Sequence, residues 1–537
     1  MDNERYSRID AALIALLAAA ALTAAIIMAI TVTERLPHLE DEIAYLFQAQ
    51  TYARGQLWAP SAPAPTGFFT PFVVTAGEGR RVGKYPIGWP VALAAGEALG
   101  AGWLVNPILA AITIGLIYAL GKELYGRQVG LVAGILALSS PLFLLQSATF
   151  MSHPITALWA TLLAWAFLRA DNARADGRNP RWWTAVCGLS IGMLAITRSL
   201  TAVAIVLPFA VILLVRLVRQ PRQIGALVKA YWPLAALALA LVALQPLCTA
   251  ILTGDPTTNL YLKVWSYDQI GFGPGRGRGV DGHTLAKALR TAQTGVKLLS
   301  SDLFGWQYLS WVPLIPGVVF GATRARPPQR YWPALLLLPA GLLIVVHMAY
   351  WVGAEVYGPR YYYEGHAGMS ILAAVGLCGT IRLLMVGLQK LANRAGNAGA
   401  TVFTFERWGG LLRWDNWLVY PALAALLAVN LLGYLPARLT AWHGLYGIVR
   451  APLDKFEELR HSENVLILVR GGHWQDYAAF FSLNNPWYDG PVVAVHDNAE
   501  GRSGDLIRLF PHREIWFYNA NTGQFSKRPS PYLKKGP

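Results

Sequence analysis

Long apolar segments separated by short polar connections run along most of this chain. The first segment, residues 9–33, contains one ionisable residue, Asp10, and exceeds the roughly 20 residues that cross a hydrocarbon core. Further apolar segments follow at 103–121, 129–148, 155–168, 182–196, 200–215, 231–252, 306–321, 331–350, 366–384 and 417–435. The pattern predicts an all-α polytopic membrane protein with about eleven transmembrane helices.

The pattern changes from about residue 451 onward, where short β-branched or aromatic runs alternate with short helical segments. The runs 465–470, 492–496 and 514–518 predict strands, and 477–483 and 504–510 predict helices between them. This order predicts a small α/β domain. We therefore divide the chain into a transmembrane domain, residues 1–435, and a C-terminal domain, residues 436–537. No glycine-rich phosphate motif follows the first strand, which favours a stabilising or docking role.

Composition and charge agree with a membrane location. The chain is 55% hydrophobic and 14% charged, against about 25% charged in soluble proteins. The net charge of +15 comes largely from short connections such as 169–181 and 216–229, and basic short loops mark the cytoplasmic side. We therefore expect a cytoplasmic N-terminus, an extracytoplasmic C-terminal domain and a plasma (inner) membrane location, and we exclude nucleic acid as a partner.

Three consecutive acidic residues, Glu40, Asp41 and Glu42, stand directly after the first apolar segment. The following segment, 43–54, predicts a helix lying in the membrane interface, and Asp41 and Tyr45 share its polar face. A solvated helix cap would explain one acidic residue, but three exceed what a cap requires. We interpret the cluster as a candidate catalytic group at the outer membrane surface.

Basic residues enter the same predicted loop within a glycine- and proline-rich stretch, residues 67–90. Arg80, Arg81 and Lys84 stand just before Tyr85. Cations beside a carboxylate match a phosphate-bearing substrate, because the cation binds phosphate while the carboxylate deprotonates the attacking group. Attraction to anionic lipid headgroups is the alternative, stronger for Arg80 and Arg81 than for Lys84.

Other polar residues occur at predicted outer turns. Arg198 stands between two apolar segments with no loop to solvate it, so it needs a partner, either phosphate or a neighbouring carbonyl or acid. Arg360 and Tyr361 suit phosphate binding or stacking on a sugar, and an interfacial aromatic belt explains them equally well. His153 is interpreted as structural more than catalytic. The basic stretch 268–283 is either a substrate lid or a plain solvated loop.

The order of these parts resembles the GT-C membrane glycosyltransferases, in the branch of dolichyl-phosphate-mannose protein mannosyltransferases and lipid A aminoarabinose transferases. The resemblance covers residues 9–384. It is carried by Asp41-Glu42, Gly83-Lys84-Tyr85-Pro86, Asn106-Pro107, Gly121-Lys122-Glu123-Leu124-Tyr125-Gly126 and Thr197-Arg198. It implies a GT-C-like fold with interfacial helices in the first outside loop.

The resemblance also implies a reaction. Asp41 would be the general base that deprotonates an acceptor hydroxyl, which attacks and inverts the anomeric carbon of a polyprenyl-phosphate-linked sugar. Lys84 would hold the leaving phosphate. Because Glu40 adds an acid to the usual pair, the base could instead be Glu42 or Glu40. The expected substrate-binding residues are Glu40, Tyr45, Lys84, Tyr85, His153, Arg198, Arg360 and Tyr361. The acceptor is a lipid, a glycan or a protein.

A metal site is not predicted. His153 stands where relatives often carry an acidic residue, which weakens the argument for a metal, although a divalent cation stays open as a cofactor. The three cysteines lie in apolar segments and form no disulfide framework or Cys-x-x-Cys motif.

The alternative function is a polytopic transporter or lipid flippase. A transporter should place ionisable or helix-breaking residues near mid-bilayer in two related halves. Here the apolar segments are nearly free of charge and show no inverted repeat. A non-catalytic scaffold would leave the acidic cluster and Lys84 unexplained.

Overall fold

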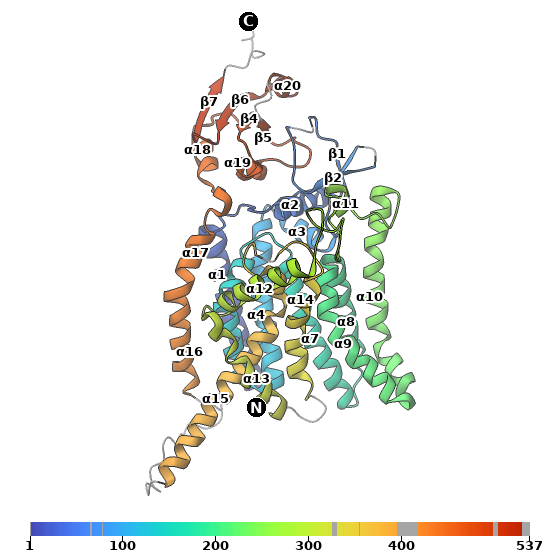
Figure 1. The fold of residues 1–537 in the computed structure, drawn as a ribbon, viewed down its shortest axis with the longest axis vertical. Coiled ribbons are helices and arrows are strands. Elements are labelled where there is room, and N and C mark those ends of the chain that lie inside the picture. The colour runs from blue at the N-terminus through green and yellow to red at the C-terminus, as the bar shows by residue number, and fades with distance from the viewer. Residues whose placement is uncertain are drawn as a thin grey trace.

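A body of helices runs along the long axis of the molecule, and a small domain with a sheet stands at one end of it (Figure 1). The computed structural model of the 537-residue chain describes residues 2–64, 67–77, 79–324, 330–353, 355–394, 417–497 and 503–528. The N-terminus lies at the end of the body opposite the C-terminal domain (Figure 1). This arrangement agrees with an odd number of membrane crossings.

The helices of the body coincide with the apolar segments. They are α1 (Asp2–Thr31), α4 (Val105–Tyr125), α5 (Arg127–Ser139), α6 (Pro141–Ser147), α7 (His153–Ala175), α8 (Arg181–Thr197), α9 (Ser199–Arg219), α10 (Ile224–Thr253), α13 (Leu314–Arg324), α14 (Trp332–His347), α15 (His366–Arg394), α16 (Val419–Ala428) and α17 (Leu435–Trp442). A π-helical segment, Val429–Tyr434, joins α16 to α17. The last helix of the body therefore continues to Trp442.

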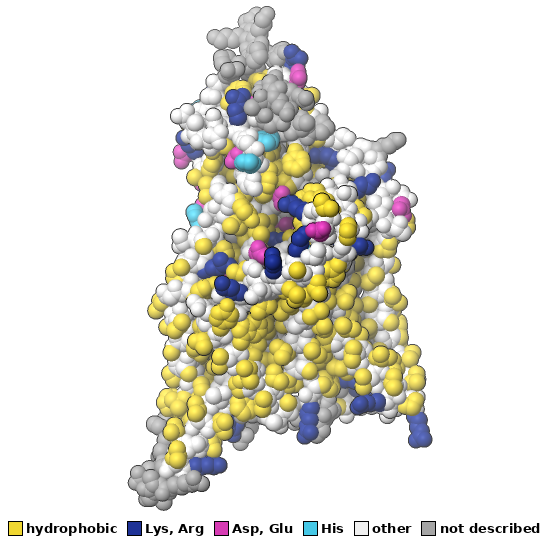
Figure 2. Space-filling model, viewed as in Figure 1, with side chains coloured by type: hydrophobic (Ala, Val, Ile, Leu, Met, Phe, Trp, Pro, Cys, Tyr) yellow, Lys and Arg dark blue, Asp and Glu magenta, His cyan; other side chains and the backbone are white. Residues whose placement is uncertain are grey.

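Six helices within the described residues are long and apolar enough to cross a membrane alone. Two more spans result if α5 with α6, bent by 65°, and Leu285–Asp302 with Gln307–Thr323, bent by 82°, each cross as a broken helix. The number of eleven spans therefore stays a prediction. A wide belt of hydrophobic side chains covers the face of the body seen in Figure 2, with Lys and Arg below it at the end opposite the C-terminal domain. The protein is a multi-pass membrane protein.

Small residues let the body helices approach closely. A Cβ added to Gly188 of α8 would stand 2.4 Å from the backbone oxygen of Leu234 in α10. Gly130 of α5 is equally close to α4, where its Cβ would stand 2.7 Å from the backbone oxygen of Tyr118. Such contacts matter in lipid because helix association there depends on close packing rather than on the hydrophobic effect. The body is thus a tightly packed support for the loops at the end next to the C-terminal domain, which is called the outer end below.

A second layer covers the outer end of the body. It contains α2 (Glu40–Ala53), which packs on α3 (Gly88–Ala98), the one-turn helix α11 (Tyr261–Val264) and the 18-residue helix α12 (Leu285–Asp302). The helix predicted over residues 43–54 is therefore present as α2, and α3 is a second helix in the first loop, as the resemblance implies. Between them lies a small antiparallel sheet in the order β1 (Ala59–Pro60), β3 (Arg80–Gly83), β2 (Val73–Ala76), which the sequence did not indicate.

The C-terminal domain has the predicted α/β character. Its sheet has the order β5 (Val492–Asp497), β4 (Val465–Arg470), β6 (Glu514–Asn519), β7 (Gln524–Arg528), with β4 parallel to β5 and β6, and β7 antiparallel to β6. Its helices are α18 (Ala451–Leu459), α19 (Trp474–Ala478) and α20 (Ser503–Arg508). Strand β7 was not predicted because its sequence is mostly polar and lies beside β6 as an edge.

Candidate functional site

The start of α2 is fixed by Glu42. Its buried carboxylate accepts hydrogen bonds from the backbone N–H groups of His38 (2.8 Å), Leu39 (3.1 Å) and Phe150 (2.7 Å). It also accepts one from the hydroxyl of Tyr357 (2.9 Å). Burial raises the pKa of Glu42 to about 7, and the four donors partly offset this rise. All contacts of this side chain are with the protein, so it anchors the helix.

Asp41, one residue earlier, is placed differently. Its side chain is half-buried, and its Oδ1 atom accepts a hydrogen bond of 2.6 Å from the hydroxyl of Tyr85. Burial raises the pKa of Asp41, but the positive charge of Arg360 and the Tyr85 hydroxyl, followed by Lys84 and Arg198, lower it further than burial raises it. Asp41 is therefore held as a carboxylate near neutral pH.

Aromatic and hydroxyl groups connect Asp41 to Arg198. The rings of Tyr85 and Tyr45 lie 4.4 Å apart, and the Tyr45 hydroxyl is 3.2 Å from Oγ of Ser152. Arg198, at the turn between α8 and α9, donates to the same serine oxygen at 3.2 Å. The polar face of α2 therefore meets the outer ends of α7 and α9.

Lys84, at the end of β3, is buried in an aromatic cage. Its Nζ lies 3.7 Å from the ring centre of Phe72 and about 5 Å from those of Tyr261 and Trp265. It donates to Oδ2 of Asp268 at 3.2 Å, and the side chains of both residues are almost fully buried. Oδ1 of Asp268 accepts further bonds from Tyr350 and Trp351. The pairing of Asp268 with Lys84 was not predicted.

Arg360 is the most unusual cation of the site. It is 4% exposed, its Nη2 lies 3.4 Å from the hydroxyl of Tyr361, and its Nε and Nη1 have no hydrogen-bond partner among the described residues. Its guanidinium also stands over the ring of Tyr361, 5.1 Å from the ring centre. A buried charge with open donors is costly unless an anion pairs with it. These donors suit phosphate oxygens.

His153 faces an acidic residue that sequence reasoning did not assign. Its Nδ1 lies 3.0 Å from Oε1 of Glu364, which also accepts from the hydroxyl of Thr156 at 2.6 Å. Arg198 approaches the same oxygen at 3.8 Å. His153 and Glu364 are both buried. An acid beside Arg360 at the start of an apolar segment was the available signal for Glu364.

The predicted residues thus gather at one outer end of the body, although not all in the same role. Contacts or electrostatic interactions connect Glu40, Asp41, Tyr45, Lys84, Tyr85, His153, Arg198, Arg360 and Tyr361. Burial and the charge of Asp41 raise the pKa of Glu40, which lies beside it. Arg80 instead stacks on Trp58, away from this cluster. Within the described ranges, no group of three or more His, Cys, Asp or Glu residues could hold a metal ion.

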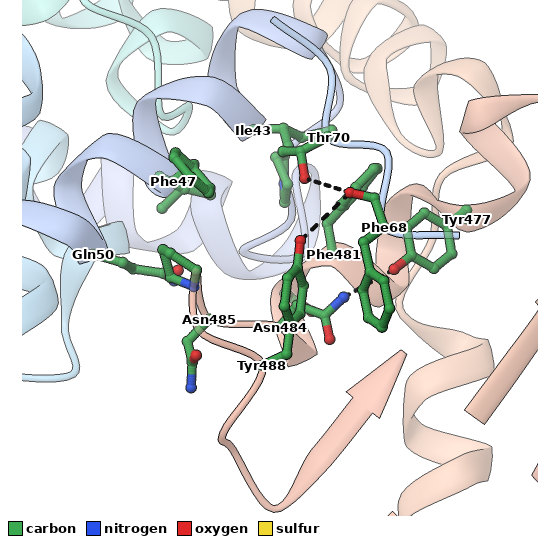
Figure 3. A pocket seen from close by; sticks show the side chains of 14 residues that line it. Ile43, Phe47, Gln50, Phe68, Thr70, Tyr477, Phe481, Asn484, Asn485 and Tyr488 are labelled. Carbon is green, nitrogen blue, oxygen red and sulfur yellow. Dashed lines mark hydrogen bonds between the residues drawn. The ribbon is translucent and has the colours of Figure 1, made fainter. Parts of the chain in front are cut away.

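The C-terminal domain contacts the opposite side of α2. Arg81 of β3 donates from Nη1 to the hydroxyl of Tyr488 (2.7 Å) and from Nη2 to the backbone oxygen of Pro486. Phe68 packs on Tyr488, with ring centres 4.3 Å apart. Figure 3 shows the cavity at this contact, where Ile43 and other α2 side chains face the C-terminal domain. Its volume of about 40 Å³ holds little more than water, so it belongs to a domain interface.

Charged side chains of both signs surround a recess beneath the C-terminal domain, just above the hydrophobic belt (Figure 2). A separate, apolar groove of about 740 Å³ lies lower, between α13, α15 and the π-helical segment. It is lined by residues including Trp306, Pro313, Leu377, Leu426, Gly433 and Tyr434. The molecule therefore offers a polar site at the membrane surface and an apolar groove within the belt.

Comparison with known proteins follows the same lines. Residues 87–248 match the family model for dolichyl-phosphate-mannose-protein mannosyltransferase. The predicted resemblance to the GT-C membrane glycosyltransferases is thereby confirmed, with the family model covering this part of the chain. No curated protein sequence matched the chain.

Two solved structures have a similar fold over nearly the whole chain. One is ArnT from Cupriavidus metallidurans in the apo state, with a TM-score of 0.55 and 14% identity over 94% of this chain and 92% of that chain. The other is the same enzyme bound to undecaprenyl phosphate, with a TM-score of 0.54 and 14% identity over 95% and 90% of the two chains. At this identity the likeness concerns the fold, including the helical body and the layer above it.

Proposed function

We propose that this protein transfers a sugar from a polyprenyl-phosphate carrier to an acceptor hydroxyl on the extracytoplasmic side of the plasma (inner) membrane. The observation that carries the proposal is the meeting of an ionised carboxylate, Asp41, with Lys84 and with the buried, partly unpaired guanidinium of Arg360. One group takes a proton, and the others suit a phosphate. The ArnT structure that binds undecaprenyl phosphate supports a carrier of this chemical class.

The reaction we propose is a single displacement. Asp41 accepts the proton of the acceptor hydroxyl, whose oxygen then forms a bond to the anomeric carbon of the sugar. The bond from that carbon to the phosphate oxygen breaks, and the electron pair leaves with polyprenyl phosphate. Arg360 neutralises the charge that develops on the phosphate, and Lys84 contributes once it releases Asp268. Attack from the face opposite the leaving group inverts the anomeric centre.

Asp41 is a better candidate base than Glu42. The carboxylate of Glu42 is surrounded by four donors from the protein itself, three of them backbone N–H groups. Asp41 has one side-chain donor, Tyr85, and is half-buried, so one oxygen stays open to an acceptor. The positive neighbours that lower its pKa also keep it ionised and ready to accept a proton.

The apolar groove is our candidate for the isoprenoid tail of the carrier. At its wall, Tyr434 donates to Oδ1 of Asp302 at 2.6 Å. A Cβ added to Gly358 would stand 2.7 Å from Oδ2 of the same aspartate, and Gly358 lies two residues before Arg360. The groove thus connects, through Asp302, to the segment that carries the proposed phosphate ligand.

The test is transfer by purified protein in lipid nanodiscs, supplied with a panel of polyprenyl-phosphate sugars and acceptors. We expect wild type to release polyprenyl phosphate and Asp41→Asn to release it roughly 100- to 10,000-fold more slowly. Glu97→Gln is the matched control. Glu97 lies on the neighbouring helix α3, and its partly buried carboxylate accepts a hydrogen bond from Gln50. Equal rates for wild type and Asp41→Asn would exclude Asp41 as the base.

A further inference from the structure

The buried cluster around Tyr361 contains polar atoms that a phosphate group would not bind. His153, Arg198 and Arg360 surround the ring of Tyr361, at 5.1 to 6.0 Å from its centre. Nε2 of His153 and Oε2 of Glu364 have no hydrogen-bond partner in the described part of the chain, and both atoms are buried. Leaving such buried atoms unpaired is costly. Their placement beside Arg360 indicates a ligand.

The contact with Glu364 decides what the free imidazole nitrogen can do. Oε1 of Glu364 accepts a hydrogen bond from the hydroxyl of Thr156 and faces the guanidinium of Arg198. This oxygen is therefore an acceptor, so Nδ1 of His153 carries the hydrogen that bridges the 3.0 Å contact. Two guanidinium groups nearby disfavour a third positive charge on the imidazole. Nε2 therefore bears a lone pair and accepts.

An acceptor at this position cannot bind phosphate, because ionised phosphate oxygens also accept. It needs an O–H or N–H donor from the ligand. The same guanidinium groups that keep the imidazole neutral would repel an ammonium group. A neutral hydroxyl next to the phosphate fulfils these conditions, and in a lipid-linked phosphosugar the nearest hydroxyls belong to the sugar ring.

We infer that Nε2 of His153 accepts a hydrogen bond from a hydroxyl group of the transferred sugar. Glu364 is the positioning residue that fixes the tautomer of His153. This inference rests on the proposed function. It makes the donor a neutral, hydroxylated sugar rather than one with an amino group at that position.

The experiment crosses protein variants with donor variants on one carrier. The donors are a fully hydroxylated phosphosugar, its single-deoxy analogues, an amino analogue and polyprenyl phosphate without sugar. We expect one deoxy analogue to lower kcat/KM of wild type by roughly 10- to 100-fold. In His153→Phe, kcat/KM for the parent sugar should fall by the same factor. Replacing the parent sugar by that deoxy analogue should then lower kcat/KM of the variant no further. Its Kd for polyprenyl phosphate should equal that of wild type.

Two more variants separate this role from a structural one. His153→Gln offers an amide oxygen that can accept, so it should recover part of the discrimination between parent and deoxy donor. Glu364→Gln should weaken that discrimination without abolishing polyprenyl phosphate binding. Thermal unfolding of each variant in detergent shows which of them fold.

Several outcomes would overturn the inference. An equal loss for every donor in His153→Phe, weaker binding of polyprenyl phosphate, or a preference for the amino analogue would each do so. Binding is measured alongside turnover. The quantity compared is the ratio of the Kd for the polyprenyl-phosphate sugar to the Kd for polyprenyl phosphate without sugar. If wild type binds the donors but transfers none, the proposed function fails, and this ratio still decides the role of His153.

Discussion

The charge of Asp41 depends on individual neighbours, and Tyr85 can be removed with the least change of shape. In Tyr85→Phe the 2.6 Å hydrogen bond to the carboxylate is lost, so the pKa of Asp41 should rise. A general base works only when ionised, so the transfer rate falls as the pH drops through its pKa. We expect this fall to move to higher pH by roughly half to one unit, measured as kcat/KM against pH.

Tyr52→Phe is the control for that measurement. Tyr52 lies on α2, the helix that carries Asp41. Its hydroxyl accepts a hydrogen bond from Gln48 instead of donating one to Asp41. The control should keep the pH profile of wild type. An unchanged profile in Tyr85→Phe, or an equal shift in both variants, would contradict the role given to Tyr85.

Single residues were predictable from sequence where their position was costly. Arg198 and Arg360 stand near the borders of apolar segments, where a charge needs a reason, and Lys84 follows two other cations in the loop that begins with the acidic cluster. Their protein partners were not predictable. Asp268 is 184 residues from Lys84, and Glu364 is 211 residues from His153, so no local pattern joins them.

At the level of elements, Glu42 fixes where α2 begins, which is the capping role that the sequence allowed for one residue of the acidic cluster. Glu42→Ala would leave three buried N–H groups and one hydroxyl without their acceptor. We expect a loss of about 3 kcal/mol or more in the free energy of unfolding, seen as a lower midpoint of thermal unfolding in detergent. Transfer should fall as well, because Asp41 occupies the same helical turn.

Two variants calibrate that loss. Glu42→Gln keeps an acceptor oxygen and should lie between wild type and Glu42→Ala. Glu97→Ala removes a carboxylate that bonds a single side chain, Gln50, and should cost less than either. A Glu42→Ala protein as stable as Glu97→Ala would show that the four contacts do not hold the helix.

Elements were predictable in proportion to their length and apolar content. The body helices follow from runs of apolar residues, and the strands β4, β5 and β6 follow from β-branched and aromatic runs. The sheet formed by β1, β2 and β3 was missed because its strands have only two to four residues. The bend between α5 and α6 lies at Ser140 and Pro141, and the bend between Leu285–Asp302 and Gln307–Thr323 lies near Gly305, which has a positive φ of 76°.

On the scale of the whole molecule, the C-terminal domain braces the layer that carries Asp41 and Lys84. Arg81, three residues before Lys84, is buried at the contact with Tyr488, whereas Arg54 pairs with Asp489 at the surface, with 43% and 56% of the two side chains exposed. We expect Arg81→Met to lower transfer roughly tenfold and to speed proteolysis between the domains. Arg54→Met removes a surface pair and should change either readout little.

The pair of variants distinguishes bracing from general stability. Both substitutions remove a cation that contacts the loop 486–489. If docking of the C-terminal domain supports the site, the loss of the buried Arg81 should lower transfer more than the loss of the exposed Arg54. Equal effects of the two variants, or full activity in Arg81→Met, would mean that the C-terminal domain does not support the site.

The groove within the hydrophobic belt gives the last prediction, because it connects the polar site to the membrane. A Cβ added to Gly433, in the groove wall, would meet no atom within 4 Å, so a larger side chain fits without displacing the protein and fills the groove instead. If the isoprenoid tail lies there, Gly433→Leu should lower kcat/KM roughly tenfold for a long carrier, through lost apolar contact. For a carrier of two isoprene units, kcat/KM should equal that of wild type.

Gly387→Leu is the matched control, because Gly387 lies in similarly open space on α15 but outside the groove. This variant should leave kcat/KM for both carriers unchanged. An equal loss for short and long carriers would place the tail elsewhere, since only a carrier that reaches the groove can sense its volume.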